Sequence, residues 1–147
     1  MGLADTTDSS VYEGLCDVLR RQPEVTSVAY RPDSIEKRYL RATTAPERPD
    51  PPTGPEPPTL DVEWRFGSEG QQYRIHYADP NTGFSCGWHR DDDHPELGAV
   101  HFQYETPSTE ETTHEAAAFE SSVPTEVLWR ALERLFEERL PSLTGGT

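Results

Sequence analysis

The fold class of this chain follows from the stretch LDVEWRF at residues 60–66. Its apolar side chains alternate strictly with charged ones, and a period of two residues is typical of a β-strand with one buried and one solvated face. A turn sequence follows at 67–70, and YRIHY at 73–77 repeats the alternation. The two segments therefore predict neighbouring antiparallel strands that share an apolar face.

Similar patterns lie on both sides of this pair. Segments with β-branched, aromatic or alternating apolar residues stand at 25–30, 38–42, 84–88 and 99–104. Short connections and repeated alternation are typical of antiparallel sheets. The sequence therefore predicts an antiparallel meander of five or six strands.

Two helices are expected, one near each end of the chain. SVYE at 10–13 has the pattern of a capping box, and an apolar face of helical period predicts a helix over about residues 10–21 that ends before Pro23. Pro124 stands in the first turn of a second, long helix, which has a broad apolar stripe over 127–140. We expect both helices to pack on one face of the sheet, which makes the fold α+β.

At 147 residues the chain has the length of one domain. That domain is expected over 10–143, with disordered ends at 1–9 and 144–147. Seven prolines make the segment 45–58 an extended internal linker. The segment 105–121 is polar and acidic and has no apolar period, so we expect a loop there.

The charge balance points to a salt-rich cytosol. Asp and Glu number 27 against 13 Lys and Arg, which gives a net charge of −14, and Lys37 is the only lysine in the sequence. This acidic, lysine-poor composition predicts a halophilic archaeon as the source. At about 1 M salt the Debye length is only about 3 Å, so the acidic charge does not exclude a nucleic-acid partner.

The sequence has no signal-peptide pattern and no apolar run of membrane-spanning length, so a cytoplasmic protein without a membrane partner is expected. Cys16 and Cys86 lie far apart and match no zinc spacing. They are predicted to be buried free thiols.

The residues best suited to catalysis are concentrated in WHRDDDHP at 88–95, and His101 follows them. Three of the five histidines fall within 13 residues, beside three consecutive aspartates and an arginine. Histidine exchanges protons near neutral pH, and an adjacent carboxylate can fix its tautomer. An acid–base site is expected here, with His94 and His101 as the proton-transfer residues and Asp93 as the group that orients a histidine.

The neighbouring residues would complete a site for metal-independent cleavage of RNA, in which the 2′-hydroxyl is the nucleophile. Arg90 is the candidate for binding a phosphate oxygen. Trp88, His89 and Gln103 are candidates for binding, and Trp88 is expected either to stack on a base or to pack beneath the loop. Strand alternation places His101 and Gln103 together on the open face of their strand.

Two other interpretations of these residues stay open. The histidines and aspartates include the residue types that bind zinc or manganese, but their spacing matches no recognised metal motif, so no metal ion and no cofactor is predicted. The second interpretation is that residues 88–95 form a polar loop whose histidines have only a structural role. Outside it, His76 is expected to be structural because it lies between Ile75 and Tyr77, and His114 has no predicted partner.

The order of the elements and this loop resemble the TumE-like toxins of prokaryotic toxin–antitoxin modules, and most closely their small haloarchaeal relatives. The matching residues are YRIHY (73–77), CGW (86–88), DHP (93–95) and HF (101–102), within a resemblance that spans about residues 25–140. The resemblance implies a cytoplasmic toxin that is paired with a small antitoxin protein encoded nearby and that acts on RNA or translation.

The chain departs from the family pattern at two positions. His89 stands where the family has an aspartate, and Gln103 replaces the second histidine of a His-x-His motif. The second change removes one half of a two-histidine acid–base pair. The alternative function is therefore a non-catalytic protein-binding module, or an inactive relative of the toxins, in a halophilic archaeon.

Overall fold

The computed structural model describes residues 8–45, 53–67, 70–91, 94–107 and 111–144. In chain order the elements are α1 (Ser9–Arg20), β1 (Val25–Arg31), β2 (Tyr39–Thr44), β3 (Thr59–Gly67), β4 (Gly70–Ala78), β5 (Ser85–Arg90), the short 3-10 helix η1 (Pro95–Leu97), β6 (Val100–Glu105), β7 (Thr113–Ala117), α2 (Pro124–Arg134), the π-helical segment η2 (Leu135–Arg139) and α3 (Leu140–Thr144). The last three elements follow one another without a break and form the long C-terminal helix that the sequence predicts.

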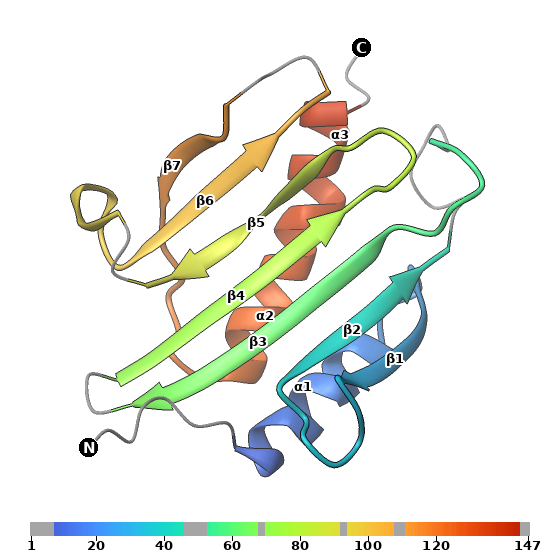
Figure 1. Cartoon of the computed structure of the whole chain (residues 1–147). Coiled ribbons are helices and arrows are strands. Elements are labelled where there is room, and N and C mark those ends of the chain that lie inside the picture. Colours follow the sequence, from blue (N-terminus) through green and yellow to red (C-terminus); the bar gives the residue numbers. More distant parts are fainter. Residues whose placement is uncertain (1–7, 46–52, 68–69, 92–93, 108–110, 145–147) are drawn as a thin grey trace.

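Within these described ranges, seven strands form one antiparallel sheet in the order β1 to β7, so strands that are consecutive in the chain are neighbours in the sheet (Figure 1). The predicted α+β class and antiparallel meander are confirmed, but the expected count of five or six strands is wrong. The additional strand, β7, lies inside the segment 105–121 that was expected to be a loop. Its sequence lacks apolar alternation because an edge strand can be held by the backbone ladder to one neighbour, here β6.

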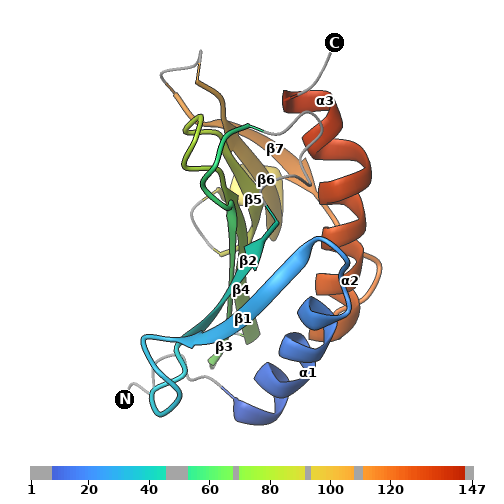
Figure 2. The ribbon, with the colours of Figure 1, turned by 90° about the vertical axis from the view of Figure 1, so that its right-hand side faces the viewer.

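The helices cover one face of the sheet, and none of the helices in the described residues covers the other face (Figure 2). The N-cap of α1 is Asp8, whose carboxylate accepts hydrogen bonds from the backbone N–H groups of Ser10 (2.9 Å) and Val11 (3.4 Å). The capping box expected at 10–13 is therefore wrong, because an aspartate just upstream satisfies the free backbone donors first. No helix in the described part of the chain is long and apolar enough to cross a membrane.

The predicted ends and linker are described only in part. Residue 8 caps α1 and residue 9 begins it, whereas residues 1–7 and 145–147 lie outside the described ranges. Within the proline-rich segment, residues 53–58 contain no helix or strand, and residues 46–52 are not described. Asn81, in the turn between β4 and β5, accepts a hydrogen bond from the Glu56 N–H (3.0 Å) and donates one to the Glu56 carbonyl (2.7 Å), so this turn holds the end of the linker.

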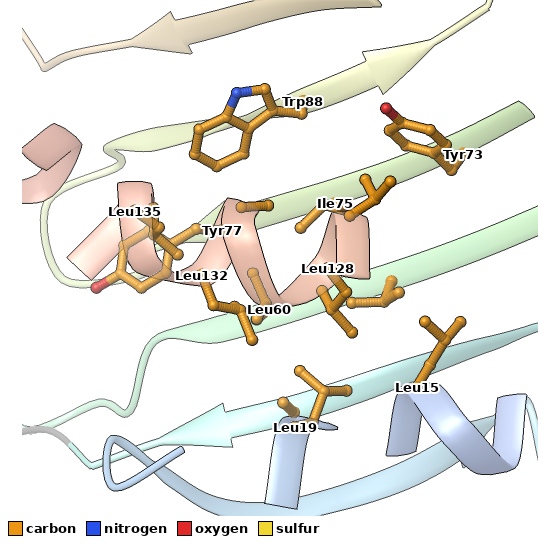
Figure 3. Packing of buried hydrophobic residues seen from close by; sticks show 14 of the residues in the cluster. Leu15, Leu19, Leu60, Tyr73, Ile75, Tyr77, Trp88, Leu128, Leu132 and Leu135 are labelled. Carbon is orange, nitrogen blue, oxygen red and sulfur yellow. The ribbon is translucent and has the colours of Figure 1, made fainter. Parts of the chain in front are cut away.

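Apolar side chains fill the space between the sheet and the helices. In the sheet they are every second residue of β3, β4 and β5, as the alternation of 60–66 and 73–77 predicts. Cys16 and Cys86 are buried free thiols, as predicted. Figure 3 shows the centre of this core, which includes Leu15, Leu19, Leu60, Tyr73, Ile75, Tyr77, Trp88, Leu128, Leu132 and Leu135.

Tyr12 joins α1 to the sheet through a buried hydroxyl group. The side chain is fully buried, and its hydroxyl donates to the backbone carbonyl of Arg38 (2.6 Å) and accepts from the backbone N–H of Trp64 (3.1 Å). Buried backbone groups need hydrogen-bond partners, so one side chain satisfies a group before β2 and a group within β3.

Replacing this hydroxyl tests its contribution. We expect Tyr12→Phe to lower the free energy of unfolding by about 1–3 kcal/mol, because buried backbone groups lose their partner. Urea denaturation followed by circular dichroism measures the effect. Tyr30→Phe, at a half-buried position of β1, is the matched control and should lie close to wild type. Equal stability of the two variants would contradict the role of Tyr12 as an anchor.

Candidate functional site

The face of the sheet without a helix carries the polar half of the strand alternation, and we call it the open face. Ile75, Trp88 and Phe102 are buried on the helix side and lie opposite one another across β4, β5 and β6. Successive side chains of a strand point to opposite faces. The residues next to these three, which include His89 and His101, therefore point to the open face.

All five histidines of the protein meet on this face. Their ring centroids follow one another from His76 to His89 (5.9 Å), from His89 to His101 (5.2 Å), from His101 to His94 (4.7 Å) and from His94 to His114 (4.1 Å). Four of the rings come from the adjacent strands β4 to β7, and His94 immediately precedes η1. We call the five residues the histidine cluster.

His101 lies at the centre of the cluster and is only 1% exposed. Its Nε2 atom is 3.1 Å from Oε1 of Gln103. Because a carbonyl oxygen accepts, Nε2 of His101 is the donor in this contact. The carboxylate of Asp91 lies between two rings, with Oδ1 4.0 Å from Nδ1 of His101 and Oδ2 3.8 Å from Nδ1 of His89. Both distances exceed those of direct hydrogen bonds.

Gly87 makes room for the cluster on β5. A Cβ atom at this position would lie 2.2 Å from the backbone oxygen of Ile75 and 3.1 Å from Nδ1 of His76. A residue without a side chain therefore allows the His76 ring to lie against β5.

Among the described residues, Nδ1 of His76 and Nε2 of His89 are buried and have no hydrogen-bond partner. Such atoms are uncommon in folded proteins and call for a specific explanation.

Burial keeps several of these imidazoles uncharged. Desolvation, assisted by the positive charge of Arg74, lowers the pKa of His76 and of His89 from 6.5 to about 4. Desolvation also lowers the pKa of His114. Near neutral pH these rings are in the neutral form, which is the form that binds metal ions and accepts protons.

The structure assembles part of the predicted site. Asp93 lies outside the described residues, and the carboxylate that is found beside His101 belongs to Asp91. The predicted site residues that come together on the open face are His89, His94, His101 and Gln103.

Trp88 and Arg90 lie on the helix-covered face, so the structure does not bring them together with the histidines, and Trp88 takes the packing role of its two expected roles. Trp88 is 1% exposed and packs on Phe102 with 4.8 Å between ring centroids, which leaves no face for stacking on a base. The Arg90 side chain donates from Nε to the backbone carbonyl of Gln71 (3.0 Å). The reason is that β5 continues to Arg90, so alternation extends through positions where a loop was expected.

Sequence reasoning does not identify two members of the cluster, His76 and His114. The position of His76 had a partial signal, because the alternation of 73–77 places it on the polar face of its strand. His114 had no local signal, because β7 itself has no strand pattern. Pairing of β7 with β6 brings His114 directly opposite Gln103.

Two groups of side chains within and beside the cluster have the geometry to hold a metal ion. The three-histidine group is His94, His101 and His114, and the Asp91 group is His89, Asp91 and His101. In each group the ligand atoms lie within 4.8 Å of one another. Imidazole suits zinc, copper and nickel, whereas a carboxylate ligand also suits manganese and iron.

Comparisons with known proteins give no match to this chain among family models, curated proteins or solved structures. The resemblance to the TumE-like toxins stays a prediction that depends on the residues quoted for it.

The depressed pKa of His76 makes the stability of the metal-free protein depend on pH. His76 is protonated near pH 6.5 in the unfolded chain and near pH 4 in the folded chain. Its contribution to the free energy of unfolding is therefore complete above pH 6.5 and is lost as the pH falls toward 4. When the pH is lowered from about 7 to 5, we expect the free energy of unfolding to fall by about 1–2 kcal/mol more in wild type than in His76→Gln. Urea denaturation at constant salt measures both, and equal losses would contradict the expectation.

Proposed function

We propose that the protein binds one divalent transition metal ion on the open face, with His94, His101 and His114 as ligands and zinc as the first candidate. The observation that carries this proposal is the three-histidine group, in which imidazoles from a loop, β6 and β7 bring ligand atoms within 4.8 Å of one another. Packing of imidazole rings against one another removes water from their nitrogens, and a shared metal ion would offset that cost.

The geometry requires only small movements to bind zinc. With zinc–nitrogen bonds of about 2.0–2.1 Å, two ligand nitrogens of a tetrahedral site lie about 3.4 Å apart. Side-chain rotations can close the remaining gap. Three protein ligands leave a fourth position for water or substrate, and this number is typical of catalytic rather than structural zinc sites. The side chain of His94 is 30% exposed, which gives that position access to solvent.

In two of the three proposed ligands, His101 and His94, one ring nitrogen contacts a neighbouring side chain, which leaves the second nitrogen for the metal ion. Gln103 contacts Nε2 of His101 at 3.1 Å, and Glu96 contacts Nδ1 of His94 at 3.4 Å. Outer contacts of this kind orient histidines that ligate metals. The two groups share His101 and differ at the other histidines: the side chain of His89 is only 14% exposed, whereas that of His94 is 30% exposed, so the Asp91 group is less accessible.

Zinc titration of single variants tests the ligand assignment. We expect the full chain to bind about one equivalent of zinc, and His114→Gln to weaken binding at least about tenfold because it removes one of three protein ligands. Competition with a chromophoric chelator measures the affinity, and elemental analysis measures the stoichiometry. His76→Gln is the matched control, since His76 belongs to the cluster but to neither ligand group.

The Asp91→Asn variant separates the two ligand groups. Retention of zinc by Asp91→Asn together with its loss in His114→Gln supports the three-histidine group. Loss in Asp91→Asn and retention in His114→Gln would overturn this assignment in favour of the Asp91 group. Less than about a tenth of an equivalent of metal in wild type would overturn metal binding altogether.

A second candidate function keeps the acid–base role expected from the sequence. Its specific observation is that the rings of His94 and His101 lie 4.7 Å apart, so a partly exposed histidine lies beside a buried one with which it could exchange a proton. In this function the chain is a toxin that is paired with a small antitoxin protein and acts on RNA without a metal ion. A non-catalytic protein-binding module remains the function if neither activity is found.

Growth of a halophilic host after induction of the gene, alone and together with its neighbouring gene, tests the toxin function. Growth arrest that the neighbour relieves and that His101→Gln abolishes would support it. RNA cleavage by the purified protein that continues in the presence of a chelator would favour the metal-independent mechanism. Cleavage that stops with the chelator and returns with zinc would favour the metal site.

A further inference from the structure

We propose that the open face binds a phosphate group and that Arg74 is the residue that holds it beside the metal ion. The substrate class is therefore a phosphate ester. This inference rests on the metal site proposed above, because the metal ion and the guanidinium group would share the same anion.

The register of the sheet places Arg74 in line with the histidine cluster. Arg74 of β4 lies directly opposite His89 of β5, and His89 lies directly opposite His101 of β6. Neighbouring strands are about 4.8 Å apart, so the backbone of Arg74 is two strand spacings from that of the central ligand. The Arg74 side chain is exposed on the same face, and its charge acts on both His76 and His89. Arg74 and a metal ion on His101 would therefore lie on the same face, on either side of His89 in the sheet.

The other arginines of the neighbouring strands on this face are already paired. Arg41 forms a salt bridge with Asp61 (2.8 Å), and Arg65 forms one with Glu63 (2.7 Å). Glu63 lies directly opposite Arg74 in the sheet, but its carboxylate contacts Arg65 instead. Within the described ranges, Arg74 forms no salt bridge.

The local charge favours an anion although the whole protein is acidic. The net charge of the chain is −14, but Arg74 places a positive charge on the histidine face, directly opposite His89. Asp91 is the acidic group between the rings, and a bound divalent ion would exceed its single negative charge. A metal ion and the guanidinium group of Arg74 on one face would together attract an anionic ligand.

Phosphate fits the two binding groups better than a simple carboxylate does. The planar guanidinium group can donate to two phosphate oxygens at once, and another oxygen remains for the metal ion. The phosphate-binding role expected for Arg90 cannot be performed at the cluster, because Arg90 points to the helix side. Strand parity places Arg74 on the histidine face, directly opposite His89.

Cobalt-loaded full-length protein provides the test, because cobalt(II) in place of zinc has a visible absorption spectrum that responds to its ligands. Inorganic phosphate is titrated at constant ionic strength into wild type, Arg74→Gln and Arg65→Gln. We expect saturable spectral change in wild type and an apparent phosphate affinity at least about tenfold weaker in Arg74→Gln, through loss of a charge-assisted bidentate contact. Arg65→Gln is the matched control from the same face and should behave as wild type.

The outcomes separate this inference from the proposal on which it rests. Absence of a cobalt spectrum in wild type would overturn the metal site and the phosphate site together. A cobalt spectrum that phosphate does not change, or that it changes equally in wild type and Arg74→Gln, would overturn the phosphate site alone. An equal response to acetate at the same concentration would overturn the assignment of phosphate as the ligand class.

Discussion

In the described part of the chain helices cover one face of the sheet, and this one-sided packing organises both the core and the histidine cluster. The helices lie on the same side, and a strand turns successive side chains to opposite sides. Apolar residues are therefore buried on one face, and their chain neighbours are left on the other. Strand register then aligns these neighbours, with His89 opposite His101 and Gln103 opposite His114. The core and the histidine cluster are two consequences of one pattern.

The histidine cluster works against stability. Desolvation lowers the pKa of His76 and His89 to about 4, and in the described part of the chain one nitrogen of each ring is buried without a hydrogen-bond partner. At Gly87, β5 also lacks the side chain that would collide with the preceding strand. A hydrogen-bonded or apolar surface would avoid these costs. Local conflicts within an otherwise consistent sequence are expected at functional sites.

The net charge of the chain does not predict which ligands the open face attracts. Acidic residues dominate the composition, yet they neutralise Arg41 and Arg65 within the sheet and leave Arg74 beside neutral imidazoles. The arrangement of charge, rather than its sum, decides which ligand a surface attracts. Salt in the surrounding solution strengthens this distinction, because it screens distant exposed charges more than close or partly buried ones.

The fold class could be predicted from the residues alone, because alternation such as that of 60–66 is a local signal. The sequence also located three histidines of the cluster, since they are close together in the chain. Only the tertiary structure decided that β7 exists and brings His114 to the site, and that Arg90 faces the helices. Both depend on where strands pair and end. Pairing is a property of two segments together, and a shift of one residue turns every side chain of a strand to the other face.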